Sequence, residues 1–441
     1  MQSTLSDRSA ASDDLIAFIN ASPTPYHAVQ SVQQRLEAKG YRRLDAAQPW
    51  QINPGDKIYL SQGDGTLAAF WLGSKAPCET GFCLIGAHTD SPNLRIKPQA
   101  DMQTHGVRQL GVEIYGGVLL STWLDRDLAL AGRVYWHSKQ GPTQALVNIN
   151  QALLRIPNLA IHLNRQVNQQ GLQLNPQQHM VPLYALAGGD TPDLRSLLAD
   201  ALTQQGINVA ATAITSWDLA LYDSQPASYV GHAETLISAG RLDNLASCHA
   251  GLCALLRLQD APAQSCGIVL YDHEECGSRS HAGAQSAFLQ HTLRRLSEAY
   301  SPDNPQGHYQ AMARSWMISA DMAHALHPNY PERHDAQHRP KLGLGPVIKT
   351  NVNQAYATDA ETQALFQAAC RKAKVQTQHF VSRNDTGCGS TIGPISAARL
   401  GIRCVDVGNP MLAMHSCREM AATCDVEPMI KAMHACFDSE L

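Results

Sequence analysis

Short apolar runs that end in metal-capable polar side chains recur along the chain. Four of them cover residues 82–87, 268–271, 316–320 and 402–407. Each run has the length of a buried strand, and amphipathic helical spacing lies between them, as in residues 244–258. Strands that alternate with helices predict an α/β sheet. Because ligands bind outside the carboxyl ends of such strands, the polar groups after the four runs are expected at one edge of the sheet.

The region before the first run predicts two helices and a hairpin. Apolar residues recur at helical spacing over residues 12–39, interrupted by Pro23 and Pro25, which favours two helices joined by a proline elbow. Residues 57–72 contain two strand-like runs separated by the turn residues at positions 63–65. A β-hairpin is therefore expected next to the first buried strand.

The pattern changes between about residue 97 and residue 230. Residues 148–179 are rich in Asn and Gln, and no cluster of carboxylates and histidines follows a strand there. Candidate strands with turn signals cover residues 112–115, 118–123, 128–136 and 213–222. We infer an inserted, mostly β domain at residues 97–230, which splits an α/β catalytic domain made of residues 1–96 and 231–441.

One helix is marked clearly inside this insertion. Thr191 has the side chain of an N-cap, Pro192 suits the first helical position, and Gly206 suits the position just past the end.

Length and composition limit the class of protein. A chain of 441 residues exceeds the roughly 250–300 at which one hydrophobic core stops growing, so at least two domains are expected. Its 34 Lys and Arg against 38 Asp and Glu give a formal net charge of −4, which disfavours nucleic acid as a partner. The first residues are too polar for a signal peptide, and no stretch of 18 apolar residues follows. A cytoplasmic protein with no membrane partner is expected.

The cysteines point away from a thiolate zinc site. The 12 Cys include no C-x-x-C pair, and several lie inside apolar runs, where a free thiol behaves as a small hydrophobe. Cys276 or Cys388 beside a histidine is a weak alternative as a nucleophile. The glycine-rich residues 387–393 fit no phosphate-binding motif and favour a tight turn into a helix.

Histidines and carboxylates at the strand ends supply the ligands of a metal site. His88 and Asp90 follow the first run, and Glu274 and Glu275 follow the second. Adjacent carboxylates after a buried strand repel each other, so one as metal ligand and one as catalytic base is a natural division of roles. These residues also have interpretations that need no metal: His88 would be hydrogen-bonded within the fold, and the two glutamates would form a solvated acidic turn. Asp243, which lies immediately before the amphipathic helix, could be its N-cap.

Taken together, six ordered segments resemble one family. They are Ala87–Pro92 (AHTDSP), Arg241–Asn244 (RLDN), Asp272–Ser278 (DHEECGS), Ser319–Ala325 (SADMAHA), Arg383–Thr386 (RNDT) and Met414–Met420 (MHSCREM). The chain resembles the aspartyl aminopeptidases, dinuclear zinc exopeptidases, from about residue 12 to residue 435. The resemblance implies a phosphorylase/peptidase-like α/β/α catalytic domain with a mixed central sheet, split by an inserted dimerisation domain.

The resemblance also implies a set of site residues. Asp243 would bridge two divalent metal ions, expected to be zinc, with manganese or cobalt as alternatives. His88 and Asp321 would complete one metal site, and Glu275 and His415 the other. In the same pattern Glu274 takes the position of the general base and acid, and Asp90 that of the supporting carboxylate.

Substrate contacts and assembly follow from the same resemblance. Lys349 and His324 match positions that approach the substrate side chain, and His162 matches a histidine that a neighbouring subunit supplies near the tetrahedral intermediate. Family members form tetrahedral dodecamers built from dimers, which is the assembly expected here.

The expected activity is removal of an acidic N-terminal residue from peptides with a free α-amine. Gly387 and residues 354–356 depart from the family pattern, so a preference for neutral residues stays open. A dinuclear amidohydrolase acting on acyl amino acids is the second alternative, because it would use the same ligands.

Overall fold

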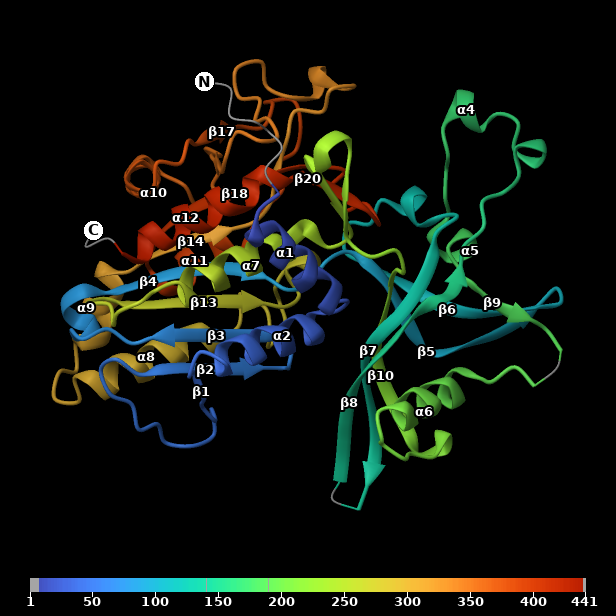
Figure 1. Cartoon of the computed structure of the whole chain (residues 1–441), viewed down its shortest axis with the longest axis horizontal. Coiled ribbons are helices and arrows are strands. Elements are labelled where there is room, and N and C mark those ends of the chain that lie inside the picture. The colour runs from blue at the N-terminus through green and yellow to red at the C-terminus, as the bar shows by residue number, and fades with distance from the viewer. Residues whose placement is uncertain (1–7, 140, 189, 439–441) are drawn as a thin grey trace.

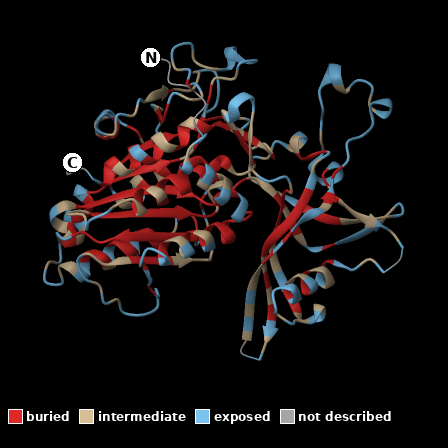
Figure 2. Ribbon diagram, viewed as in Figure 1, coloured by how far each residue is buried: buried red, intermediate tan, exposed pale blue. Residues whose placement is uncertain are grey.

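A helix-covered sheet lies beside a β-barrel in the computed structural model of this chain (Figure 1). The structure describes residues 8–139, 141–188 and 190–438. The sheet is formed by segments from both ends of the chain, whereas the barrel is formed by residues between 93 and 223. Figure 2 shows the sheet strands buried almost throughout, while the barrel strands carry more exposed positions.

Nine strands form the central mixed sheet, and the four apolar runs lie together at its centre as β13, β4, β14 and β18. These four strands are mutually parallel, so their carboxyl ends meet at one edge, as predicted. In spatial order the strands are β1 (Arg42–Arg43), β2 (Lys57–Gln62), β3 (Thr66–Trp71), β13 (Ser265–Tyr271), β4 (Phe82–His88), β14 (Trp316–Ala320), β18 (Arg403–Gly408), β16 (Val347–Lys349) and β17 (Gln378–Phe380).

Helices cover both faces of this sheet. One buried cluster packs it against α1 (Ala10–Ala21), α2 (Pro25–Glu37), α7 (Leu242–Leu256), α10 (Ala360–Lys372) and α12 (Val426–Phe437). A second cluster lies on the other face, with α8 (Phe288–Tyr300), α9 (Gly307–Arg314) and α11 (Ile392–Leu400); the short α3 (Pro77–Thr80) lies beside α9. The proline elbow and the hairpin are confirmed, and α11 follows the glycine-rich segment as expected. The tight turn expected within residues 387–393 is wrong, because residues 387–391 are irregular and the turn lies at residues 384–385.

Six antiparallel strands close the barrel around a hydrophobic cluster of its own. In order they are β10 (Ile214–Asp223), β5 (Asn93–Thr104), β6 (Val107–Tyr115), β9 (Leu183–Leu186), β8 (Gly141–Arg155) and β7 (Asp127–Ser138). The short helices α4 (Val167–Gln170) and α5 (Pro176–His179) lie between β8 and β9 along the chain. The proposed boundaries at residues 97 and 230 stay a prediction.

Two expectations inside this region are wrong. Residues 118–123 do not form a strand, because Leu120 and Trp123 begin and end a 3-10 turn that directs both side chains to the barrel cluster. Helix α6 (Leu194–Gln204) starts later than predicted, because the carboxylate of Asp193 caps it by accepting the Ser196 N–H at 2.8 Å. Neither Thr191 nor Pro192 is part of the helix, although Gly206 follows its end as expected.

A small sheet stands next to the carboxyl edge of the large one. Its strands are β11 (Ser228–Val230), β12 (Leu236–Ala239), β20 (Glu419–Ala422), β19 (Pro410–Leu412) and β15 (Ala323–His324). It therefore joins the segments that follow β14 and β18 to the one that leads into α7.

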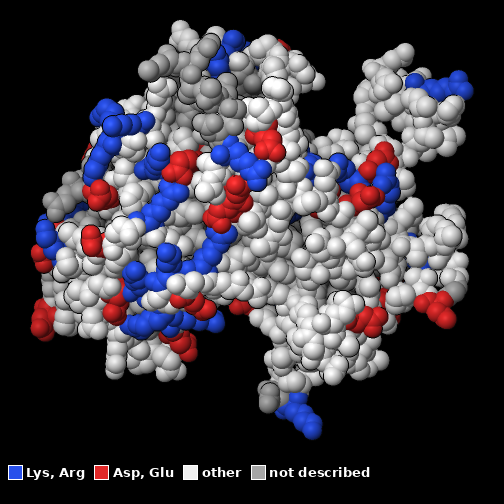
Figure 3. All heavy atoms as spheres, in the orientation of Figure 1, with Lys and Arg blue, Asp and Glu red and all other residues white. Residues whose placement is uncertain are grey.

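The surface carries mixed charge. On the face shown in Figure 3, Lys and Arg alternate with Asp and Glu, and no large area of one sign stands out. Within the described residues, no helix has the length and apolar content that a membrane span needs.

Candidate metal centre and active site

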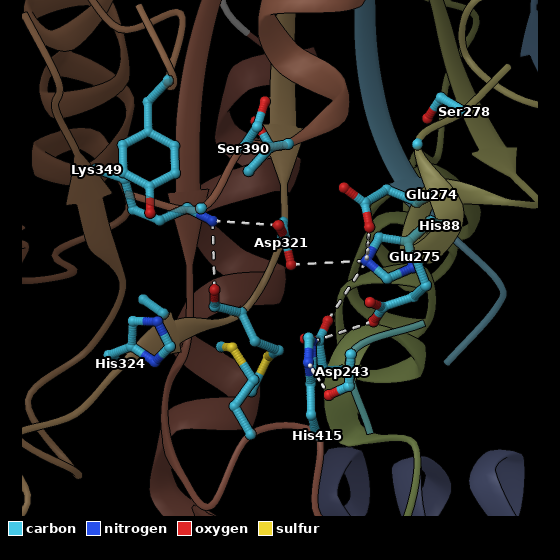
Figure 4. A pocket seen from close by; sticks show the side chains of 18 of the residues that line it. His88, Asp243, Glu274, Glu275, Ser278, Asp321, His324, Lys349, Ser390 and His415 are labelled. Atoms are coloured by element: carbon cyan, nitrogen blue, oxygen red, sulfur yellow. Dashed lines mark hydrogen bonds and ion pairs between the residues drawn. The ribbon is translucent and has the colours of Figure 1, made fainter. Parts of the chain in front are cut away.

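The sequence-predicted ligands converge at the carboxyl edge of the central strands. His88 is the last residue of β4, Asp321 follows β14, and Glu274 and Glu275 lie in a 3-10 turn after β13. Asp243 lies in the first turn of α7, whose amino end faces the same edge. Figure 4 shows these side chains pointing toward one another, with His415 completing the group.

Two sets of ligand atoms share Asp243. His88 Nε2 lies 3.4 Å from Asp243 Oδ1 and 3.7 Å from Asp321 Oδ1. His415 Nε2 lies 3.5 Å from Asp243 Oδ2 and 3.3 Å from Glu275 Oε1. Asp243 thus directs one oxygen to each imidazole, and each set offers a histidine and a carboxylate besides this shared residue.

Glu274 stands beside the first set. Its Oε2 lies 3.9 Å from His88 Nε2, further than the oxygens of Asp243 and Asp321. The side chain is 15% exposed and lines the pocket, so a water molecule bound there can reach it. This position suits a carboxylate that exchanges protons more than one that is fully engaged as a ligand.

Both imidazoles are held in the tautomer that ligates a metal through Nε2. His88 Nδ1 lies 3.0 Å from the carbonyl oxygen of Asp90, and His415 Nδ1 lies 3.0 Å from that of Gly117. A carbonyl oxygen only accepts, so Nδ1–H donates in each case, which leaves Nε2 as the nitrogen that faces the carboxylates and can ligate a metal.

Asp90 holds the backbone turn that carries Glu274 and Glu275. It is fully buried, and its two oxygens accept the backbone N–H groups of Glu274 at 3.1 Å and Glu275 at 3.0 Å. The hydroxyl of Tyr115 donates to Asp90 Oδ2 at 2.6 Å. These bonds fix the turn that carries both glutamates, and with the His88 contact they account for the lowered pKa of Asp90 in spite of its burial.

Local backbone geometry brings the remaining ligands into place. Arg241, just before α7, and His415 adopt left-handed conformations with φ of 63° and 67°. Glu419, in β20, joins the two segments because its carboxylate accepts the N–H groups of Asp243 at 3.1 Å and His415 at 2.8 Å. A Cβ at Gly117 would lie 3.2 Å from His415 Nδ1, which explains the glycine at this close approach.

The carboxylates at the centre have strongly perturbed pKa values. Burial, together with neighbouring carboxylates, raises the pKa of Glu274 to about 8 and that of Glu275 to about 7, although His88 and His415 oppose the rise. Burial also opposes ionisation of Asp243, but the imidazoles of His415 and His88 hold its pKa well below the ordinary value. For His415, burial lowers the pKa, yet Asp243 and Glu275 together raise it to about 11. The centre is therefore a cluster of buried titratable groups whose pKa values depend on one another.

A pair of divalent cations fits this residue set. Asp243 Oδ1 and Glu275 Oε1 are buried and accept no hydrogen bond, so each has a lone pair directed into the centre. Carboxylate oxygens and neutral imidazole nitrogens are ligands for zinc, manganese and cobalt. Each of the two sets that share Asp243 offers three residues that could ligate a cation.

The expected substrate residues lie in the same pocket. It has a volume of about 530 Å³ and is lined by the ligands together with Lys349, His324 and Tyr356. Lys349 ends β16, is buried, and donates from Nζ to the carbonyl oxygen of Met322 at 3.3 Å. His324 ends β15, with its ring 5.8 Å from that of Phe380.

His162 is not brought to this pocket. It lies exposed in a 3-10 turn between β8 and β9, where Leu159, Ile161 and Leu163 are also exposed, at 59%, 47% and 75%. The alternative nucleophile Cys276 also finds no support. Its exposed thiol contacts the hydroxyl of Tyr115 and the backbone carbonyl of His273 rather than a histidine ring, and burial raises its pKa, which disfavours the thiolate.

Sequence reasoning missed two supporting residues, Glu419 and Tyr115. Glu419 is an acidic residue inside an otherwise apolar strand, which is a sequence signal for a buried functional carboxylate. Tyr115 ends β6 of the barrel, and only the three-dimensional structure brings it next to Asp90.

Comparisons with known proteins point to one family of metalloproteases. The sequence model of the family described as "Aminopeptidase I zinc metalloprotease (M18)" matches residues 18–437. A protein from Azotobacter vinelandii named "Probable M18 family aminopeptidase 2" is 48% identical over 435 residues, which are 98% of this chain and 99% of that protein.

Solved structures show the same fold. One described as "Cryo-EM structure of the Ape4 and Nbr1 complex" superposes with a TM-score of 0.95 at 38% identity, over 99% of this chain and 87% of that one. Another, described as "Structure of S. cerevesiae mApe1 dodecamer", has a TM-score of 0.85 at 27% identity, over 98% of this chain and 97% of that one.

Proposed function

The chain belongs to the M18 family of zinc metalloaminopeptidases, and on that premise we propose that it removes acidic residues, Asp or Glu, from the N-terminus of peptides. The observation that carries this proposal is the position of Lys349, whose ammonium lines the same pocket as the carboxylate and histidine cluster. A buried cation there can pair with the side-chain carboxylate of a substrate, which a neutral side chain cannot do.

We propose that His88 and Asp321 hold one cation, that Glu275 and His415 hold the other, and that Asp243 contacts both. Two cations, expected to be zinc with manganese or cobalt as alternatives, would supply a water of lowered pKa and polarise the scissile carbonyl. The support for this division is the pair of ligand sets that share Asp243.

Glu274 is proposed as the proton carrier. Its carboxylate accepts a proton from the attacking water and delivers it to the leaving amine, so that the glutamate ends in the state in which it began. Asp90 holds the backbone of this residue in place through the 3.1 Å bond from its N–H.

The free α-amine of the substrate sets the position of cleavage. An ammonium or amine at the substrate N-terminus can pair with the carboxylate cluster, which supplies the acidic residues that line the pocket in the described part of the chain. A peptide held there presents its first peptide bond to Glu274 and no later one.

We also propose a homo-oligomer, a tetrahedral dodecamer built from dimers, in which residues 97–230 form the dimerisation domain. The solved structure described as a dodecamer supports the assembly, and the exposed leucines beside His162 support a protein contact at that turn. His162 would then enter the active site of the neighbouring subunit and stabilise the oxyanion.

A substrate panel tests the proposed activity. The chelated protein is reloaded with zinc, manganese or cobalt and assayed with Asp-, Glu-, Leu- and N-acetyl-Asp-peptides. We expect cleavage of the Asp and Glu peptides to exceed that of the Leu peptide, and no cleavage of the acetylated one. Equal cleavage of acetylated and free peptides would favour an amidohydrolase, and a faster rate on Leu would favour a preference for neutral residues.

A further inference from the structure

A second group of metal-capable side chains lies on α7, away from the pocket. His249 and Cys253 are one helical turn apart, and Asp14 of α1 meets them from the neighbouring helix (Figure 1). His249 Nε2 lies 2.8 Å from Asp14 Oδ2 and 3.4 Å from Cys253 Sγ, and Cys253 Sγ lies 3.9 Å from Asp14 Oδ2. Three different ligand atoms thus converge on one point.

These separations resemble those of a tetrahedral metal site. Zinc bonds of about 2.0–2.3 Å to nitrogen, oxygen and sulfur place the ligand atoms roughly 3.3–3.7 Å from one another. The three observed distances, from 2.8 to 3.9 Å, reach this arrangement with shifts of about half an ångström. Histidine and cysteine at i and i+4 on one helix face need no backbone change to ligate together.

One side of this group is exposed to solvent, and its carboxylate is paired with Arg35. The Asp14 side chain is 44% exposed, so a cation and a fourth ligand such as water can enter, whereas His249 is buried and held in place. Arg35 donates to Asp14 Oδ1 at 3.0 Å and to Oδ2 at 2.8 Å, so Oδ2 has to exchange its bond from Arg35 for the metal, while the bond to Oδ1 can stay. Arg257 lies nearby but is paired with Glu427 at 2.8 Å.

The protonation states also suit a ligand set. Burial lowers the pKa of His249, so its imidazole is neutral at neutral pH. Burial and Asp14 raise the pKa of the Cys253 thiol to about 12, so the thiol is protonated until a metal binds. Coordination then breaks the S–H bond, forms a metal–sulfur bond and releases one proton to solvent.

We propose that Asp14, His249 and Cys253 form a third metal site, for a thiophilic divalent cation such as zinc or cadmium, that ties α1 to α7. The site is separate from the catalytic centre, because His249 lies six residues beyond Asp243, roughly 9 Å along the helix. Its sulfur ligand also distinguishes it, since the two catalytic sets contain only histidine and carboxylate.

Cadmium titration tests the proposal through the ultraviolet charge-transfer band of a thiolate–cadmium bond. The full-length protein is first loaded with zinc and then titrated with cadmium alone. We expect a band that saturates at one equivalent and is lost in Cys253→Ala. Asp14→Asn should weaken the cadmium affinity about tenfold or more, because it removes a charged ligand.

A matched cysteine serves as the control. Cys78→Ala, at a half-buried thiol on α3, should keep the band of the unaltered protein. Circular dichroism checks the fold of each variant, and Cys253→Ser, which keeps the side-chain size, replaces the alanine variant if that one does not fold. A missing band in the unaltered protein, a band that persists without Cys253, or an unchanged affinity in Asp14→Asn would overturn the proposal.

Discussion

The ammonium of Lys349 lies 3.5 Å from Asp321 Oδ2, so the residue proposed to read the substrate already pairs with a proposed metal ligand. In Figure 4, Lys349 and Asp321 face each other, and Glu274 and Glu275 lie on the opposite side of the pocket. Lys349 Nζ also lies 5.1 Å from the centre of the Tyr356 ring, and both residues line the pocket. A substrate carboxylate that enters here meets a cation fixed in position by its neighbours.

Lys349→Met should separate acidic from neutral substrates. The change keeps the apolar stem and removes the charge, so a charged hydrogen bond of about 1.5–3 kcal/mol is lost only with Asp and Glu substrates. We expect kcat/KM for Asp and Glu peptides to fall about 10- to 100-fold, with a much smaller change for Leu peptides. Lys341→Met, at an exposed lysine, is the control. An equal loss on all three substrates would exclude Lys349 as the reader of the side chain.

Tyr115→Phe should loosen the support of the two glutamates. The variant removes the 2.6 Å hydrogen bond to Asp90, which accepts the N–H groups of Glu274 and Glu275. Loss of a hydrogen bond to a buried carboxylate lowers the free energy of unfolding by about 1.5–3 kcal/mol. We expect this loss together with a lower kcat and an unchanged KM. Tyr309→Phe, at an exposed tyrosine, should change neither, and an unaltered kcat in Tyr115→Phe would remove this link between barrel and site.

His27 should make stability depend on pH below neutrality. Burial, followed by the charge of Arg241, lowers its pKa to about 4 in the folded chain, against 6.5 when unfolded. The unfolded state therefore binds the proton first as the pH falls, so the contribution is complete above about pH 6.5 and is lost progressively toward pH 4. Its full size is on the order of 2–3 kcal/mol.

The measurement is urea unfolding of the unaltered protein and of His27→Gln between pH 7 and pH 4. The difference in free energy of unfolding between the two should shrink as the pH falls. His137→Gln, at an exposed histidine, is the control variant. A constant difference for His27→Gln would contradict the account.

His162 should act across a subunit boundary. His162→Ala and Glu274→Gln are each expected to be inactive alone. Co-expressed in one assembly, they should regain activity, because a subunit with an intact Glu274 then receives an intact His162 from its partner. Different affinity tags on the two variants and sequential purification on both tags isolate the mixed assemblies. Mixed assemblies that stay inactive, or a His162→Ala variant with normal kcat, would rule out a contribution in trans.

The site residues at the strand ends could be predicted from sequence, because each polar side chain directly follows a run of buried apolar residues. His88, Glu274 and Asp321 each follow an apolar run, and the parallel arrangement of those runs brings them together. Lys349 could be placed only by resemblance, since nothing in its local sequence shows that β16 pairs with β18 beside the centre.

Two further features could not be settled from the sequence: the residue that caps α6, and the role of His162 in an assembly. The start of α6 depended on which of two neighbouring residues, Thr191 or Asp193, caps the helix, a choice that propensity alone does not settle. The role of His162 depends on a second subunit, so it remains a prediction.

Glu274→Gln tests the central claim most directly, because it separates proton transfer from metal binding. The replacement keeps the size of the side chain and removes its ability to take up a proton, while the five proposed ligands stay intact. Metal content per chain and kcat on an Asp-peptide are measured together, with Glu298→Gln at an exposed glutamate as the control. We predict an unchanged metal content and a kcat lower by about 10²-fold or more. A normal kcat, or a kcat loss that metal loss accounts for, would contradict the assignment.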